Sequence, residues 1–123
     1  MVEKAVYLER RLPLTHSELI DYCRLSFEEI SADCPFKDGE NIVLRHKENG
    51  KWFALLFARN KRAYVNLKCD PQKADFWRSV YAGVQPGWHM NKRHWNTVDL
   101  QSDIPDRELY EMLADSYTLT ACK

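Results

Sequence analysis

The chain has 123 residues, 45% hydrophobic and 12% aromatic, so it is long enough for one core and too apolar to be disordered. Its formal net charge is zero, which argues against a generally polybasic protein. No apolar run approaches the roughly 20 residues of a membrane span, and the N-terminus lacks the apolar region of a signal peptide, so we expect a cytoplasmic protein without membrane contact.

The four cysteines, Cys23, Cys34, Cys69 and Cys122, stand far apart and show no zinc-ribbon spacing. We therefore expect reduced, mostly buried thiols, no metal site and no cofactor.

The charges cancel in total but are segregated along the chain. Residues 45–68 contain seven Lys or Arg and one acid, whereas residues 99–116 contain six acids and one base. Residues 15–33 contain five acids and one base. Solvated helices are often acidic, so the basic segment, which falls on predicted strands, is the more informative one.

The domain is predicted to begin with a helix and a loop. Thr15-His16-Ser17-Glu18 matches a capping box, and apolar residues then recur at helical spacing to about position 30. Residues 31–40 contain Asp, Pro and Gly and are predicted to form a loop.

Three strands follow. The first two, about 41–46 and 52–57, flank Asn49-Gly50, which supplies the two positive-φ residues of a type I′ turn. The third covers 62–68. There the polar residues Arg62, Tyr64, Asn66 and Lys68 alternate with the apolar residues Ala63, Val65 and Leu67, so the two sets are expected on opposite faces.

Asp70-Pro71 then predicts a helix start, with Asp70 as N-cap. This helix runs to about Tyr81. Two more strands are predicted over 84–89 and 95–100, and a last helix opens at Pro105.

The predicted order is α-β-β-β-α-β-β-α, an α+β fold. Short turns between consecutive strands indicate an antiparallel meander with helices packed on one face. The domain spans 15–123, and residues 1–14 form an N-terminal arm whose structure the sequence does not decide. We favour a monomer.

The segment Pro86–Asn96 is the richest in chemistry. It contains two tryptophans, two histidines and two strong cations, with no acidic residue. Such a mixture is suited to stacking on a ring, hydrogen bonding a polar ligand and neutralising phosphate.

The chain resembles the MmcQ/YjbR family of small bacterial proteins in four segments, which are Asn66–Pro71, Pro86–Val98, Ile104–Asp106 and Asp115–Tyr117. The resemblance covers about Thr15 to the C-terminus. It implies a compact α+β domain with a CyaY-like (frataxin-like) fold. It also implies DNA binding through a double wing of two hairpins, with no established enzymatic activity.

Our first hypothesis is a protein that binds DNA phosphates through two basic hairpins, without catalysis. Backbone contacts dominate such binding, so little sequence specificity is expected. The alternative for these side chains is an ordinary solvated turn and polar outer face. The predicted nucleic-acid-binding residues are Arg59, Lys61, Arg62, Tyr64, Lys68, Asn91, Lys92, Arg93 and His94.

The second hypothesis is a pocket for a small anionic ligand or a peptide, lined by the Pro86–Asn96 segment. Its predicted residues are Asn66, Lys68, Trp88, His89, Asn91 and Trp95. A concave site that joins Trp88, His89, Asn91 and Lys68 would distinguish it from protruding hairpins. The segment also has a purely structural interpretation, in which Asn91 and His94 are hydrogen-bonded inside a tight hairpin and at least one tryptophan packs structurally.

Three further alternatives stay open. The acidic helices suit a basic protein partner. Cys69 with His89 or His94 is conceivable as a nucleophile pair, although Cys69 ends a core strand. By fold analogy alone, the acids of the first helix and the loop after it would form an iron-binding ridge of Glu18, Asp21, Glu28, Glu29 and Asp33.

Overall fold

The computed structural model describes residues 14–35, 41–102 and 104–121. Nearly all of the predicted N-terminal arm therefore lies outside the described residues, as does Cys122. Leu14, the first described residue, is buried in the core. The elements are α2 (His16–Ser26), β1 (Ile30–Asp33), β2 (Ile42–His46), β3 (Trp52–Arg59), β4 (Arg62–Lys68), α3 (Pro71–Val80), β5 (Val84–Pro86), β6 (Trp95–Asp99) and α4 (Asp106–Ala121).

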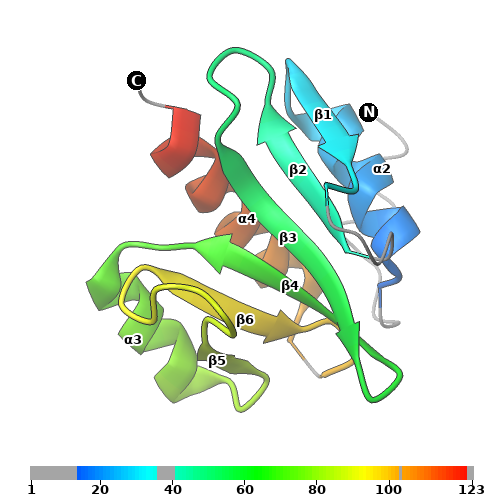
Figure 1. Ribbon diagram of the computed structural model, residues 1–123. Helices are drawn as coiled ribbons and strands as arrows, with labels where there is room; N and C mark the ends of the chain where they lie inside the picture. Colours follow the sequence, from blue (N-terminus) through cyan, green and yellow to red (C-terminus); the bar gives the residue numbers. More distant parts are fainter. Residues whose placement is uncertain (1–13, 36–40, 103, 122–123) are drawn as a thin grey trace.

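The six strands form one sheet in the order β1-β2-β3-β4-β6-β5, and all neighbours are antiparallel. Helices α2, α3 and α4 cover one face of this sheet, and the main apolar core lies between the two layers (Figure 1). The α+β class and the antiparallel sheet are thus confirmed. The meander holds only from β1 to β4, because β6 lies between β4 and β5.

Strand β1 was not predicted, and it occupies part of the segment expected to be a loop. The predicted helix over 16–30 ends at Ser26, where the backbone becomes extended at Phe27. Glu29 then adopts a left-handed conformation (φ 55°), which redirects the chain into β1. Phe27 packs against the core at a position that matches helical spacing, so the apolar pattern did not reveal the helix end.

The hairpin turns also differ from the prediction. In the β2–β3 turn Gly50 has a left-handed backbone (φ 75°), but Asn49 does not. The side chain of Asn49 instead accepts from the Lys51 N–H (2.8 Å) and donates to the Thr120 carbonyl (3.0 Å). The two consecutive positive-φ residues that a type I′ turn requires are Asn60 and Lys61, between β3 and β4.

The predicted N-caps of the first two helices are confirmed, and the third predicted helix begins at Asp106, one residue after Pro105. The Thr15 hydroxyl accepts from the Glu18 N–H, and the Glu18 carboxylate accepts from the Thr15 N–H (3.0 Å). Asp70 caps α3 by accepting from Gln72 N–H, with Pro71 at the first helical position. None of the helices in the described ranges is long and apolar enough to cross a membrane.

His46, at the end of β2, is buried beneath α4. Its Nε2 lies 2.7 Å from the Thr120 hydroxyl, and its ring packs on Tyr117 with a centroid distance of 4.5 Å. Burial lowers the pKa of His46 below its usual value of about 6.5, and burial lowers the pKa of His16 as well.

These lowered pKa values predict a loss of stability on acidification. Below about pH 6.5 His16 and His46 bind protons more readily in the unfolded chain than in the folded protein. The free energy of unfolding therefore falls as pH decreases from 7.5 to 5.5. Urea unfolding of the wild type and of His46→Gln across this range tests the prediction. The difference in free energy of unfolding between the wild type and His46→Gln is expected to become smaller toward acid pH. A difference that stays constant with pH would contradict the prediction.

Candidate functional site

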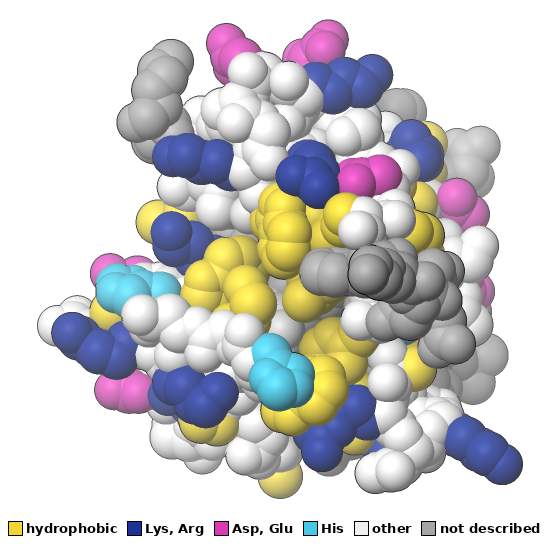
Figure 2. All heavy atoms as spheres, viewed as in Figure 1, with side chains coloured by type: hydrophobic (Ala, Val, Ile, Leu, Met, Phe, Trp, Pro, Cys, Tyr) yellow, Lys and Arg dark blue, Asp and Glu magenta, His cyan; other side chains and the backbone are white. Residues whose placement is uncertain are grey.

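The sheet face opposite the helices, here called the helix-free face, carries a second apolar cluster. Val43, Leu55 and Phe57 are buried in it. The half-buried residues that pack against them are Trp52, Tyr64, Trp88 and Met90. Figure 2 shows hydrophobic side chains across the middle of this face, with Lys, Arg and His side chains and one acidic side chain around them. An apolar patch with a polar rim is typical of a binding surface.

The segment between β5 and β6, residues 87–94, folds over this face instead of projecting from it. The Trp88 N–H donates to the Thr97 hydroxyl (2.8 Å), and the Asn66 amide donates to the Trp88 carbonyl (3.0 Å). The Thr97 hydroxyl in turn donates to Asn66 Oδ1 (2.5 Å). These bonds hold the segment, called the docked loop below, against β4 and β6.

The position of the docked loop also requires a glycine at residue 87. A Cβ at Gly87 would lie 2.7 Å from the Cβ of Trp95, so only glycine fits where the docked loop leaves β5. Trp95 is half-buried at this contact and pairs with Lys68 across the strands. Both tryptophans of the Pro86–Asn96 segment therefore have packing roles.

Arg78 of α3 holds the other side of the docked loop. Its Nε donates to Asn96 Oδ1 (2.6 Å), and its Nη2 donates to the carbonyls of Trp95 (3.3 Å) and Lys92. Arg78 is not among the residues that the sequence pattern predicts for the site. One arginine near the end of an amphipathic helix carries no signal, because its partners lie 14–18 positions away.

Trp88 is the centre of the face. Its ring stacks on Phe57 with a centroid distance of 5.0 Å, and the Arg59 guanidinium lies 4.4 Å from its centroid. The ring of His89 lies beside it at 4.0 Å. His89 is exposed and has a left-handed backbone (φ 62°), a conformation that is uncommon outside glycine and sometimes marks functional sites.

Two hollows of the helix-free face meet at Trp88. The apolar hollow, of about 330 Å³, is lined by Asn41, Trp52, Leu55, Phe57, Trp88, His89 and Met90. The cationic hollow, of about 370 Å³, is lined by Arg59, Tyr64, Gln85, Pro86, Trp88, Lys92 and Thr97. Among the residues that the structure describes, neither lining includes an Asp or Glu. The two volumes lie within the range of about 300–1,000 Å³ that is typical of ligand sites.

The predicted nucleic-acid-binding residues are dispersed by this arrangement. Arg59 and Lys92 line the cationic hollow, with Lys92 Nζ also donating to the Gly87 carbonyl (2.6 Å). Arg62 is paired with Asp99 (2.7 Å) and Lys61 lies in the β3–β4 turn. Arg93 is exposed in the docked loop.

Asn91, His94 and Tyr64 have contacts within the fold. Asn91 Oδ1 accepts from the N–H groups of Arg93 (2.9 Å) and His94 (3.3 Å), and the His94 carbonyl accepts from the Cys69 N–H (2.8 Å). These contacts agree with the structural interpretation, in which Asn91 and His94 are hydrogen-bonded within the segment itself. Tyr64 stacks on Phe57 at 5.4 Å.

The predicted ligand pocket is only partly assembled. Trp88 and His89 do line one hollow, but Asn91 and Lys68 line neither, so the expected concave site joining all four is absent from the described hollows. Asn66 is fully buried and occupied by its hydrogen bonds to the docked loop and Thr97. Trp52 and Phe57 of β3 were missed as pocket residues, because an apolar strand position gives no sign of which face is open. Met90 was missed because it lies in the docked loop, whose position on the sheet depends on long-range contacts.

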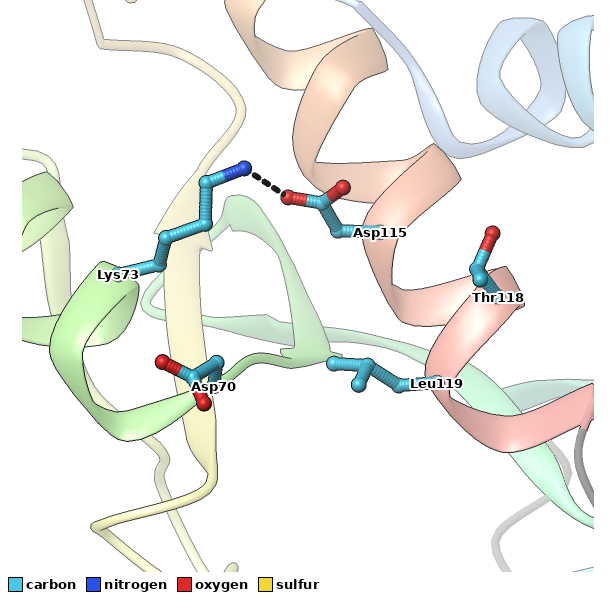
Figure 3. Close-up of a pocket in the computed structure, with 5 residues that line it drawn as sticks. All are labelled: Asp70, Lys73, Asp115, Thr118 and Leu119. Atoms are coloured by element: carbon cyan, nitrogen blue, oxygen red, sulfur yellow. Dashed lines mark hydrogen bonds and ion pairs between the residues drawn. The ribbon is translucent and has the colours of Figure 1, made fainter.

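A further hollow lies between α3 and α4 on the helix side of the sheet. It measures about 230 Å³ and is lined by Asp70, Lys73, Asp115, Thr118 and Leu119. Lys73 and Asp115 point toward one another at 2.7 Å (Figure 3), and Lys73 also approaches Glu111 (3.4 Å). The ammonium group is thus already neutralised within the protein, and this hollow is a weaker candidate.

The thiol and the acids of the alternative hypotheses are also placed. Cys69 is buried, and burial, with a smaller contribution from Asp115, raises the pKa of its thiol to about 11, so the thiolate is scarce near neutral pH. Cys23 is buried and Cys34 is exposed. Glu18 is used in the capping box and Asp33 pairs with Arg45 (2.8 Å). No group of three His, Cys, Asp or Glu side chains in the described part of the chain is arranged to hold a metal.

Fold and site together define a small α+β domain with an aromatic, cation-lined face on its sheet. The YjbR family model matches residues 25–119, and the chain therefore belongs to the YjbR family, which confirms the resemblance noted in its motifs.

Relatives and solved structures agree. The chain is similar to YjbR of Escherichia coli (strain K12), with 32% identity over 105 residues and 85% of each chain covered. It is similar to YyaQ of Bacillus subtilis (strain 168), with 32% identity over 73% of this chain and 85% of YyaQ. A crystal structure from Deinococcus radiodurans superposes with a TM-score of 0.81 at 29% identity, covering 93% of this chain and 84% of that one. One from Pseudomonas syringae gives 0.78 at 29% identity, covering 87% and 99%.

Proposed function

We propose that the protein binds DNA through the helix-free face, with its cations on phosphates and without catalysis. The observation that supports this proposal is the cationic hollow, where Arg59 and Lys92 converge and no described lining residue is acidic. Among the described residues neither cation pairs with a carboxylate. An ammonium group carries three donors, so Lys92 retains two beyond its bond to the Gly87 carbonyl.

This proposal differs in shape from two protruding wings. The β3–β4 turn extends from the sheet (Figure 1), but the docked loop lies flat on the helix-free face. Lys61 and Arg93 therefore supply exposed charges at two separate places, with the cationic hollow between the segments that carry them. Phosphate contacts of this kind orient DNA and carry little sequence information, so modest specificity is expected.

The family resemblance supports the same proposal, since it implies both DNA binding and a CyaY-like fold. We extend the proposal to that fold type, in which one antiparallel sheet is covered by helices on a single face. The observed layers are compatible with it.

The test is fluorescence anisotropy of labelled DNA across a salt series. Arg59→Gln/Lys92→Gln removes both charges of the cationic hollow while keeping polar donors at these positions. Loss of two phosphate contacts is expected to weaken binding at least about tenfold at low salt, and to make the slope of log K against log salt less negative by about 1.8.

The matched control is Arg24→Gln/Arg107→Gln, which removes the same charge from exposed positions on α2 and α4. Its affinity and salt slope are expected to stay close to those of the wild type. Equal losses in the two double variants would mean that net charge alone drives binding. If wild-type protein fails to bind at low salt, the proposal is wrong.

A further inference from the structure

The apolar hollow and the cationic hollow share one wall, the side chain of Trp88. One side offers the ring surfaces of Trp52 and Phe57 together with Met90, and the other offers Arg59 and Lys92. A ligand that spans both must combine a flat, weakly polar ring system with a negative charge a short distance away. A base joined through its sugar to a phosphate has this chemistry.

His89 is placed to help such a ligand. It lines the apolar hollow, its side chain is exposed, and its ring lies 4.0 Å from the Trp88 ring. The left-handed backbone at His89 is held by the neighbouring bonds of Trp88 to Asn66 and Thr97. A neutral imidazole at the rim of the apolar hollow offers a base edge one donor and one acceptor nitrogen, whereas the indole N–H groups of Trp52 and Trp88 can only donate.

We propose that the apolar hollow accepts one unpaired base while Arg59 and Lys92 hold the adjoining phosphate, so that the ligand class is a nucleotide unit of a single strand. This inference rests on the proposed function and names its substrate more narrowly. A base that is paired and stacked within a duplex cannot enter a hollow, so single strands bind more tightly than duplexes of the same length.

The first test uses three of the four tryptophans as internal probes. In a ¹⁵N-labelled sample the indole N–H signals of Trp52 and Trp88 are expected to shift on adding thymidine 5′-monophosphate. The indole of Trp77 is buried on the helix side of the sheet and is expected to stay in place. Single Trp→Phe variants assign the signals.

Inorganic phosphate and thymidine serve as the two half-ligands. Phosphate alone is expected to leave the Trp52 signal unchanged, because that ring lines only the apolar hollow. If phosphate reproduces the whole set of shifts, or if millimolar nucleotide moves neither indole, the inference is overturned.

The second test compares a labelled single strand with its duplex in Trp52→Ala and His89→Gly. Base stacking contributes enough that Trp52→Ala should weaken single-strand binding about fivefold to a hundredfold and leave duplex binding within about twofold. His89→Gly relieves the left-handed strain and so keeps the fold, and it should narrow the single-strand preference. Equal losses for strand and duplex in both variants would refute base capture.

The two proposals fail separately. If DNA binds in a salt-dependent way but the indole N–H signals of Trp52 and Trp88 do not shift, the DNA-binding proposal is supported and the base-binding hollow is refuted. Shifted indoles with no binding of any DNA would support the hollow as a site for a free nucleotide and remove the DNA function.

Discussion

Arg78→Ala is expected to destabilise the protein by about 2–4 kcal/mol and to release the docked loop from α3. The guanidinium donates to Asn96 Oδ1 and to the carbonyls of Trp95 and Lys92. Asn96 is buried, so its oxygen would lose a charged donor without gaining water. Because Lys92 lines the cationic hollow, DNA affinity should fall together with stability.

Urea unfolding and hydrogen exchange of residues 87–94 measure this effect. Arg78→Lys is expected to recover little, since a single ammonium group cannot reach acceptors that the planar guanidinium bridges. Asp75→Ala is the control for the exposed ion pair to Arg78. That pair spans 3.6 Å with Asp75 81% exposed, so its loss should cost less than about 0.5 kcal/mol. An Arg78→Ala protein as stable as Asp75→Ala would contradict the assigned role.

Thr97→Val is expected to lower the free energy of unfolding by about 2–6 kcal/mol although it hardly changes the shape of the side chain. The hydroxyl accepts from the Trp88 N–H and donates to Asn66 Oδ1, and both Thr97 and Asn66 are buried. Valine leaves the N–H and the amide oxygen without partners, and each such group costs about 1–3 kcal/mol.

The readout is the urea midpoint together with the indole signal of Trp88, which should broaden or move as the docked loop loosens. Thr118→Val is a suitable comparison, because Thr118 is exposed on α4. It is expected to change stability by less than about 0.5 kcal/mol. An equal loss of stability in Thr97→Val and Thr118→Val would show that the buried hydrogen bonds of Thr97 do not stabilise the fold.

Thr97 and its partner Asn66 show which features can be predicted from a sequence and which cannot. Thr97 lies in a correctly predicted strand, yet its alternation pattern gave no reason to separate it from Trp95 or Asp99 on the same face. Its partner Asn66 was selected as a ligand contact and is instead a buried structural residue. Hydrogen bonds between positions 31 apart leave no local pattern.

Local signals succeeded where the interaction itself is local. The capping box at Thr15, the Asp70-Pro71 helix start and the alternation over 62–68 each depend on residues a few positions apart. Strand β1 was missed for the opposite reason, because four residues paired only along β2 have too few alternations to be recognised.

The family, the α+β class and the face on which the polar residues of β4 lie can be predicted from the amino-acid sequence, since they depend on motifs, helix caps and two-residue periodicity. Two features depend on long-range contacts: the β5–β6 segment docks on the sheet, and Trp88 joins an apolar hollow to a cationic one. The physical reason is that β6 enters the sheet beside β4, which brings Asn66, Thr97 and the docked loop into contact. Strand order of this kind is set by long-range packing, which residue spacing does not encode.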